Sequence, residues 1–252
     1  MKKTLIALAA AAMVFTAVSC GEKEKGTSSE GVNAETTIEV SAGELMKDIS
    51  ERAAVEKADM TAKPTEKCDI PDDWKELTVD GLKIRVPSGV EELNADPGMR
   101  RFGDETKGLY LTTSAAVEYD GGVLFSALNP DTSEEKVRQA FSELGIEYNG
   151  TRLSFLKAAL SITSADKTDE NAEAFETAIK AKGGEFDFAD EVYVSESDGH
   201  QIYIILDKKF FKSDVVSLTV YYFVDEKTAY TVGINAGTME EALQIATNLS
   251  LA

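Results

Sequence analysis

The amino-acid sequence predicts an α+β fold in which an antiparallel β-sheet of hairpins is flanked by helices, in the manner of an α/β/α sandwich. Two Asp-Gly pairs, Asp80-Gly81 and Asp198-Gly199, each lie between runs of alternating apolar and polar residues, which is typical of two-residue hairpin turns. Capping-box motifs introduce helical patterns in other stretches of the chain. Because hairpins and helices are segregated, we expect helices packed on the faces of an antiparallel sheet.

The first strands are expected soon after Trp74, which is predicted to be a core residue. A hairpin is predicted within Leu77–Val86, and Pro87 ends its second strand because proline cannot donate to a ladder. Apolar and β-branched residues predict further strands at Gly108–Thr113 and Val123–Leu128.

A helical insertion is predicted at about residues 133–182. Thr132-Ser-Glu-Glu135 has the spacing of a capping box, and Gly145 is a natural helix stop. A second helix is predicted at Arg152–Ile162, and a third at Asp169–Lys182, before a Gly-Gly pair. These helices separate the first set of strands from the second.

The last third of the chain has the most regular pattern. Glu191–Leu206 contains the second Asp-Gly hairpin, and Val215–Val224 with Thr228–Asn235 predicts a third. Thr238-Met-Glu-Glu241 is a capping box that opens a terminal helix. The residues of that stretch expected to face the core are Leu243, Ile245, Ala246 and Leu249.

The N-terminal twenty residues resemble the signal of bacterial lipoproteins. Two lysines precede an apolar run, Leu5–Val18, and small residues lead to Cys20. The run is too short for a hydrocarbon core about 30 Å thick, which argues against a transmembrane helix. The resemblance implies that residues 1–19 are a removed signal peptide and that Cys20 carries diacylglycerol, with palmitate or another N-acyl group. An ordinary secretory signal that leaves a free thiol is the alternative.

Residues 20–37 are predicted to be a flexible tether, because their composition offers almost no apolar area to bury. Residues 38–73 are expected to hold a helix from Ser41 to about Ala58, followed by a linker bounded by prolines. Cys68 is interpreted as a small buried apolar residue; pairing with another chain and a redox role are the alternatives.

The composition excludes several classes of function. A net charge of −19 disfavours binding to nucleic acid, although it permits cationic partners. The sole histidine, His200, rules out catalytic sites that need a pair of histidines, and a Ser-His-Asp set has no sequence support. Neither a P-loop nor a GxGxxG motif is present. We therefore predict no cofactor or metal besides the lipid on Cys20.

Two local clusters are weighed as binding sites. Residues 166–171 carry several oxygen ligands but lack the spacing of a calcium loop, so they are interpreted as a helix N-terminus with Thr168 or Asp169 as cap. A basic and aromatic run stands out on the acidic chain and is predicted to dock a partner. The alternative is a hairpin loop whose lysines are solvated and whose phenylalanines pack under the edge of the sheet. Its residues are Lys208, Lys209, Phe210 and Lys212.

The order of elements over residues 74–252 resembles the Mog1/PsbP-like α/β/α sandwich family. The resemblance rests on an early hairpin that ends in Val86-Pro87 and on the strand-turn-strand-helix unit from Val216 to Leu249. It implies an accessory role in binding or assembly without enzymatic activity.

The leading hypothesis is a lipid-anchored binding or assembly protein of the cell envelope, with an envelope protein as partner and the membrane contacted through the lipid. The alternatives are a tethered hydrolase that uses carboxylates and a carrier of a small ligand. A hydrolase requires acidic groups with perturbed pKa values in a cleft, whereas a carrier requires an apolar cavity between sheet and helices.

Overall fold

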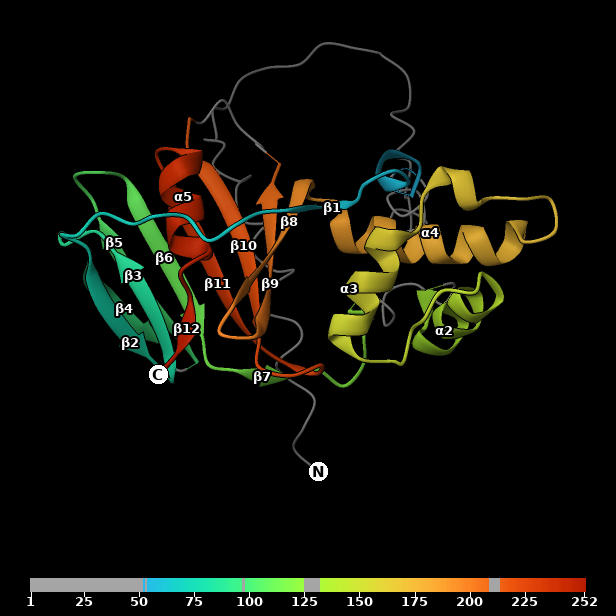
Figure 1. Cartoon of the computed structure of the whole chain (residues 1–252), viewed down its shortest axis with the longest axis horizontal. Coiled ribbons are helices and arrows are strands. Elements are labelled where there is room, and N and C mark those ends of the chain that lie inside the picture. The colour runs from blue at the N-terminus through green and yellow to red at the C-terminus, as the bar shows by residue number, and fades with distance from the viewer. Residues whose placement is uncertain (1–51, 53, 97, 125–131, 209–213) are drawn as a thin grey trace, which may run out of the picture. The chain divides into compact units, whose positions relative to one another are not determined.

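The computed structural model describes residues 52, 54–96, 98–124, 132–208 and 214–252, and it confirms an α+β fold (Figure 1). Among these residues the larger sheet has nine strands, in the order β1-β8-β9-β10-β11-β6-β5-β4, with β7 paired to β11. Its strands are β1 (Ala62–Pro64), β4 (Glu91–Asp96), β5 (Met99–Asp104), β6 (Leu109–Ser114), β7 (Val117–Glu118), β8 (Ala189–Ser197), β9 (His200–Asp207), β10 (Val216–Phe223) and β11 (Thr228–Ala236).

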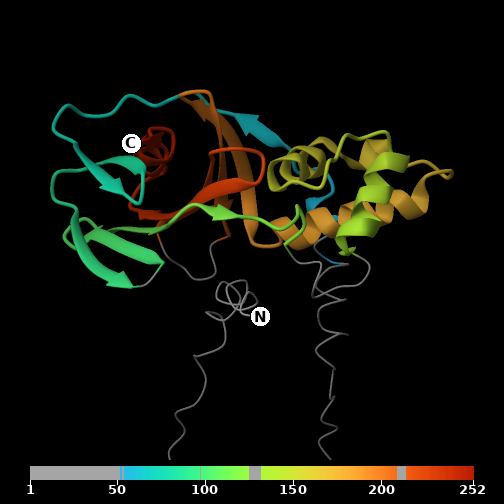
Figure 2. The ribbon, with the colours of Figure 1, turned by 90° about the horizontal axis from the view of Figure 1, so that it is seen from below.

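A smaller sheet has the order β12-β3-β2. Its strands are β2 (Lys75–Val79), β3 (Leu82–Val86) and β12 (Ser250–Leu251). The helices are α2 (Glu134–Glu143), α3 (Arg152–Ser161), α4 (Ala172–Phe186) and α5 (Met239–Ala246), with a 3₁₀ turn at Ser164–Asp166. Figure 2 shows α2, α3 and α4 grouped together and apart from α5.

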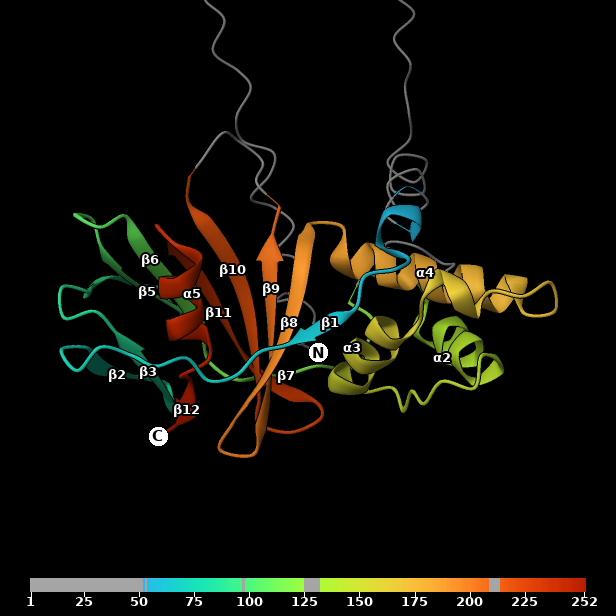
Figure 3. The same cartoon turned by 45° about the horizontal axis from the view of Figure 1, so that its top comes forward.

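Each face of the larger sheet contributes to a different core, because successive side chains of a strand point to opposite faces. In β9, Tyr203 and Ile205 pack in one core with the α2–α4 group. Ile202 and Ile204 pack in the other core with α5 and the smaller sheet. Figure 3 shows α5 lying between the larger sheet and the β2–β3 hairpin. The predicted arrangement of helices on both faces is confirmed.

The two Asp-Gly hairpins form where the sequence predicts them. Asp80 and Gly81 have φ of 52° and 93°, and Asp198 and Gly199 have φ of 52° and 78°. Positive φ at both central residues is the geometry of a type I′ turn, which matches the twist of the flanking strands. The third hairpin, β10–β11, is also confirmed.

The strand predicted at Val123–Leu128 is wrong for the part of it that is described. Val123 and Leu124 lie in a loop outside any strand, and residues 125–128 are outside the described ranges. Glu134 holds this loop, because its Oε2 accepts hydrogen bonds from the amides of Gly122 and Val123 at 3.1 and 3.2 Å. The apolar Val123 side chain is buried among α2 and α3 instead of in a strand.

Two details of the helical insertion also differ from the sequence prediction. The N-cap of α2 is Ser133, with no capping bond from its side chain, so Thr132 does not cap this helix. The third helix begins at Ala172, with Asn171 as N-cap instead of Thr168 or Asp169, and continues past the Gly-Gly pair to Phe186. Phe186 is 1% exposed, and burying its ring outweighs the low helix propensity of the glycines.

The ends of the described chain agree with most expectations. Residue 52 and residues 54–57 are helical, as predicted, whereas residues 41–51 lie outside the described ranges. Trp74 is buried in the core. The hydroxyl of Thr238 accepts the amide of Glu241 at 3.1 Å and caps α5, in which Leu243 is only partly buried. The helix ends at Ala246, so Leu249, expected in the terminal helix, lies after it but is fully buried. No helix in the described ranges is long and apolar enough to cross a membrane.

Candidate functional site

A groove of about 420 Å³ opens at the β1 edge of the larger sheet; we call it the edge groove. It lies where the short strand β1 stops covering the beginning of β8, since β1 pairs only with Val192, Tyr193 and Val194. The preceding turn carries the chain away from the sheet and leaves this space. The charged residues that line the groove are Glu56, Lys57, Asp59, Lys63, Asp190 and Glu191.

Lysines hold two of the groove carboxylates in the ionised form. The hydrogen bonds of Glu56 to Lys208 and then to Lys57 lower its pKa to about 2. A hydrogen bond from Lys63, at 2.7 Å, lowers the pKa of Glu191, and the hydroxyl of Tyr193 adds to this effect. Neither carboxyl group carries a proton near neutral pH, so neither can act as a general acid there.

Lys57 fixes the floor of the edge groove. It is 4% exposed, and its Nζ donates to the carbonyl of Ala189 at 2.5 Å and to Glu56 at 2.9 Å. A buried lysine is costly unless it is paired and hydrogen-bonded, and both conditions are met here. Lys57 thereby ties the helical turn at residues 54–57 to the start of β8.

The predicted basic run begins at the rim of this groove. Lys208 follows β9, and its Nζ lies 2.7 Å from Oε1 of Glu56. Its side chain is 25% exposed, so it serves an internal ion pair as well as facing solvent. Lys209, Phe210 and Lys212 lie outside the described residues, as does Cys20, and their roles stay predictions.

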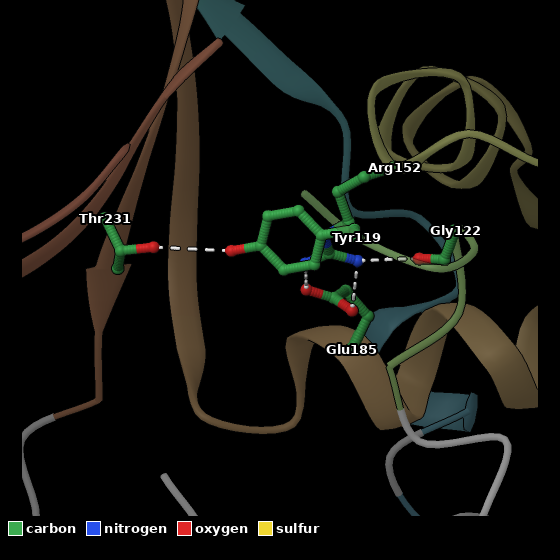
Figure 4. Close-up of polar contacts among 5 residues, drawn as sticks. All are labelled: Tyr119, Gly122, Arg152, Glu185 and Thr231. Carbon is green, nitrogen blue, oxygen red and sulfur yellow. Dashed lines mark hydrogen bonds and ion pairs between the residues drawn. The ribbon is translucent and has the colours of Figure 1, made fainter. Parts of the chain in front are cut away.

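A buried ion pair joins α3 to α4 (Figure 4). Arg152 is fully buried; its Nη1 donates to Glu185 at 2.8 Å and to the carbonyl of Gly122 at 2.9 Å, while Nη2 pairs with the other oxygen of Glu185. Its guanidinium carbon lies 5.7 Å from the ring centroid of Tyr119 and 5.2 Å from that of Tyr221. Burial disfavours the charge, but Glu185 outweighs this effect and raises the pKa of Arg152.

Lys182 is a second buried cation of the helical insertion. Its Nζ donates to the carbonyls of Ala58 and Ile162 at 2.9 and 2.6 Å, and burial lowers its pKa to about 8. It thereby ties the end of α3 and the segment before β1 to α4. Sequence reasoning missed Arg152, Lys182 and Lys57; a signal was available only for Lys182, which lies between Ala181 and Gly183 in a helical stretch.

Asp207 is the carboxylate that comes nearest to the alternative hypothesis of acid catalysis. Burial raises its pKa, hydrogen bonds from Ser217 and Thr219 oppose this, and the charge of Asp190 adds to the increase. Its Oδ2 accepts from Ser217 at 2.9 Å and from Thr219 at 3.2 Å. Asp207 does not line the edge groove, so it and Asp190 do not converge on one cleft.

The remaining predicted positions have structural partners. Nδ1 of His200 lies 3.0 Å from the carbonyl of Phe223. Asp166 accepts from the amide of Thr163 at 2.8 Å, which makes the acidic loop a turn, and no metal-binding group of three or more ligands occurs within the described ranges. Cys68 is half-buried instead of fully buried, and its amide donates to Thr247 at 3.0 Å.

No protein family and no curated protein matches this sequence. Among solved structures, a protein of Bacteroides thetaiotaomicron VPI-5482 aligns with 71% of this chain at 11% identity and a TM-score of 0.34, and the aligned part spans only 49% of that protein. Cyanobacterial PsbP (CyanoP) from Synechocystis sp. PCC 6803 aligns over 74% of this chain and 98% of its own, at 10% identity and a TM-score of 0.37. The predicted PsbP-like resemblance thus has a counterpart among the solved structures, at low sequence identity.

Proposed function

We propose that this chain is a cell-envelope accessory protein, anchored by the lipid on Cys20, that binds an envelope protein and has no catalytic activity. The observation that carries the proposal is the pairing of Glu56 and Glu191 with lysines in the edge groove. A hydrolase that uses a pair of carboxylates needs one of them to hold its proton near the working pH, so that it can act as the general acid. A groove lined by ionised pairs instead presents fixed charges of both signs to a partner.

The ion pair between Lys63 and Glu191 can be exchanged at small cost. The side chains of Lys63 and Glu191 are 55% and 37% exposed. Exposed pairs contribute only about 0–1 kcal/mol, because water screens both charges. A partner segment that carries a carboxylate and an ammonium group can therefore replace the internal pair. Lys208, which pairs with Glu56, would add a cationic contact at the rim of the groove.

One experiment separates partner recognition from local stability. A benzophenone amino acid placed at Asp190 in the full chain should cross-link an envelope protein, whereas the same probe at the exposed Glu118 of β7 should not. The charge-swapped variant Lys63→Glu/Glu191→Lys retains an ion pair but reverses its direction. It should lose the cross-link without a change in melting temperature. Equal cross-linking by the swapped variant would show that the groove does not recognise charge.

Anchoring is tested separately on the same full-length chain. Cys20→Ala should remove the protein from the detergent phase in phase partitioning, because the acyl chains supply the membrane affinity. The wild-type chain should stay in that phase. Cys68→Ala is the matched control, since it removes the other cysteine and should leave partitioning unchanged. Full retention of the Cys20→Ala protein would contradict the lipoprotein proposal.

The hydrolase alternative is favoured by one observation, the raised pKa of Asp207. Asp207→Asn preserves the shape of the side chain and removes its titration. A hydrolytic activity of the purified chain that disappears in Asp207→Asn, at an unchanged melting temperature, would replace the accessory role with the enzymatic one.

A further inference from the structure

One face of the larger sheet is buried beneath helices at β8 and β9 but only partly buried at β10, β11 and β6. A row of residues that pair with one another across these strands shows the difference. Val192 of β8 and Ile205 of β9 are buried beneath the α2–α4 group. The same row continues through Thr219 of β10, Gly233 of β11 and Thr112 of β6, all only partly buried. The core formed with α2–α4 contains no described side chain of β4, β5 or β6. This second half is an open, polar sheet face.

Tyr110 places an aromatic ring on this open face. Its side chain is 40% exposed, and it pairs across the sheet with Gly103 of β5 and Asn235 of β11. A Cβ atom at Gly103 would lie 3.0 Å from Cδ1 of Tyr110 and 2.9 Å from Cδ1 of Leu93. The ring and the leucine therefore lean over the bare glycine from opposite sides. Together they form a low apolar platform.

Groups that donate and accept hydrogen bonds surround the platform. Asn235 is exposed, and it lies directly beside Tyr110 because the two residues pair on neighbouring strands about 4.8 Å apart. Arg101 is exposed one row away, opposite the half-buried Thr112, and Ser217 lies beyond Asn235 on β10. Carboxylates lie at both ends of the same cross-strand row, because Glu91 of β4 is exposed opposite Gly103 and Asp207 of β9 accepts the hydroxyl of Ser217 at 2.9 Å. The platform thus combines one aromatic ring with a polar rim of amide, guanidinium and carboxylate groups, all of which can bond hydroxyl groups.

We propose that Tyr110, Asn235 and Arg101 form a binding site for a neutral oligosaccharide. A pyranose ring has an apolar face of C–H bonds and a rim of hydroxyl groups. The Tyr110 ring is suited to the C–H face through dispersion, while the amide of Asn235 and the guanidinium of Arg101 can bond the hydroxyls. A protein partner would be expected to bury a larger apolar core than one ring and one leucine provide. This site lies on β5, β6 and β11, away from the edge groove at β1 and β8.

The cross-strand pairing of Tyr110 with Gly103 also stabilises the sheet, because an aromatic side chain can cover a strand glycine. The test must therefore distinguish the contact of the aromatic ring with a ligand from the stabilisation that any apolar side chain over Gly103 would give. Tyr110→Leu keeps an apolar side chain over Gly103 and removes the ring. Tyr110→Phe keeps both. Tyr193→Ala on β8 is the matched control, because Tyr193 packs with the core on the opposite face.

The experiment is isothermal titration of the full chain with β-1,4-linked hexasaccharides of glucose and of N-acetylglucosamine. At least one of them should bind with a dissociation constant below about 1 mM. Tyr110→Leu should weaken this binding about tenfold at an unchanged melting temperature, the factor expected for the loss of one ring contact. Tyr110→Phe and Tyr193→Ala should bind as the wild type does. Failure of both sugars to bind, or equal binding by Tyr110→Leu, would overturn the proposal.

Discussion

Removing the charge of Glu185 should destabilise the domain more than removing any exposed charge of the same helix. The substitution Glu185→Gln preserves the shape of the side chain but leaves the cation of Arg152 without a counter-charge. Arg152 is fully buried and the side chain of Glu185 is 4% exposed, so water cannot replace the lost partner. Breaking a buried ion pair on one side costs about 3–5 kcal/mol.

Urea unfolding at pH 7 measures this cost as a lower midpoint at an unchanged slope. For a domain of this size each kcal/mol lowers the melting temperature by about 2–4 °C, so a decrease of about 6–20 °C is expected. Glu173→Gln is the matched control, because Glu173 is exposed in the first turn of α4, and its effect should stay within about 0.5 kcal/mol.

A double substitution distinguishes the ion pair from simple packing. Arg152→Met/Glu185→Met removes both charges and leaves neither one buried alone, so it should cost less than Glu185→Gln. The rings of Tyr119 and Tyr221 would then contact an apolar side chain in place of the guanidinium. A cost below about 1 kcal/mol for Glu185→Gln, or a double variant less stable than the single one, would refute the reasoning.

Two further predictions concern stability. Lys182 has a folded pKa of about 8, below that of an unfolded lysine near 10.4, so the unfolded chain binds more protons between these values and the free energy of unfolding should rise from pH 8 to pH 10. Lys182→Met should flatten that rise in urea titrations, and an unchanged slope would contradict the burial of the ammonium group. Leu249→Ala should cost about 2–5 kcal/mol because Leu249 is fully buried, whereas Leu243→Ala should cost less than half as much; equal costs would mean that α5 packs differently.

Local turn chemistry made the hairpins predictable from the sequence. Asp80-Gly81 and Asp198-Gly199 favour positive φ whatever surrounds them, so the turns and their flanking strands follow from short stretches of chain. The short strands β1 and β12 were not predictable in this way. Each exists only through pairing with a distant strand, β8 or β3, and three or two residues carry no periodic pattern of their own.

The errors arose where tertiary packing overrides a local signal. An apolar run such as Val123–Leu128 fits a buried strand and a buried loop equally well. The hydrogen bonds of Glu134 to the amides of Gly122 and Val123 hold the start of this run as a loop. The edge groove could not be predicted, because it depends on where β1 leaves β8. The basic run at Lys208 was visible in the sequence, but its pairing with Glu56 required the fold.

The smaller sheet has a consequence for the chain while it is being synthesised. Ser250 of β12 pairs with Lys83 of β3, and the amide of Ala252 donates to the carbonyl of Gly81 at 2.9 Å. Leu82 and Ile84 are therefore covered by α5 and β12, which the ribosome makes long after β3. A nascent chain that stops before this point displays the apolar face of β3. That face becomes covered only after α5 and β12 have been made and have docked on β3.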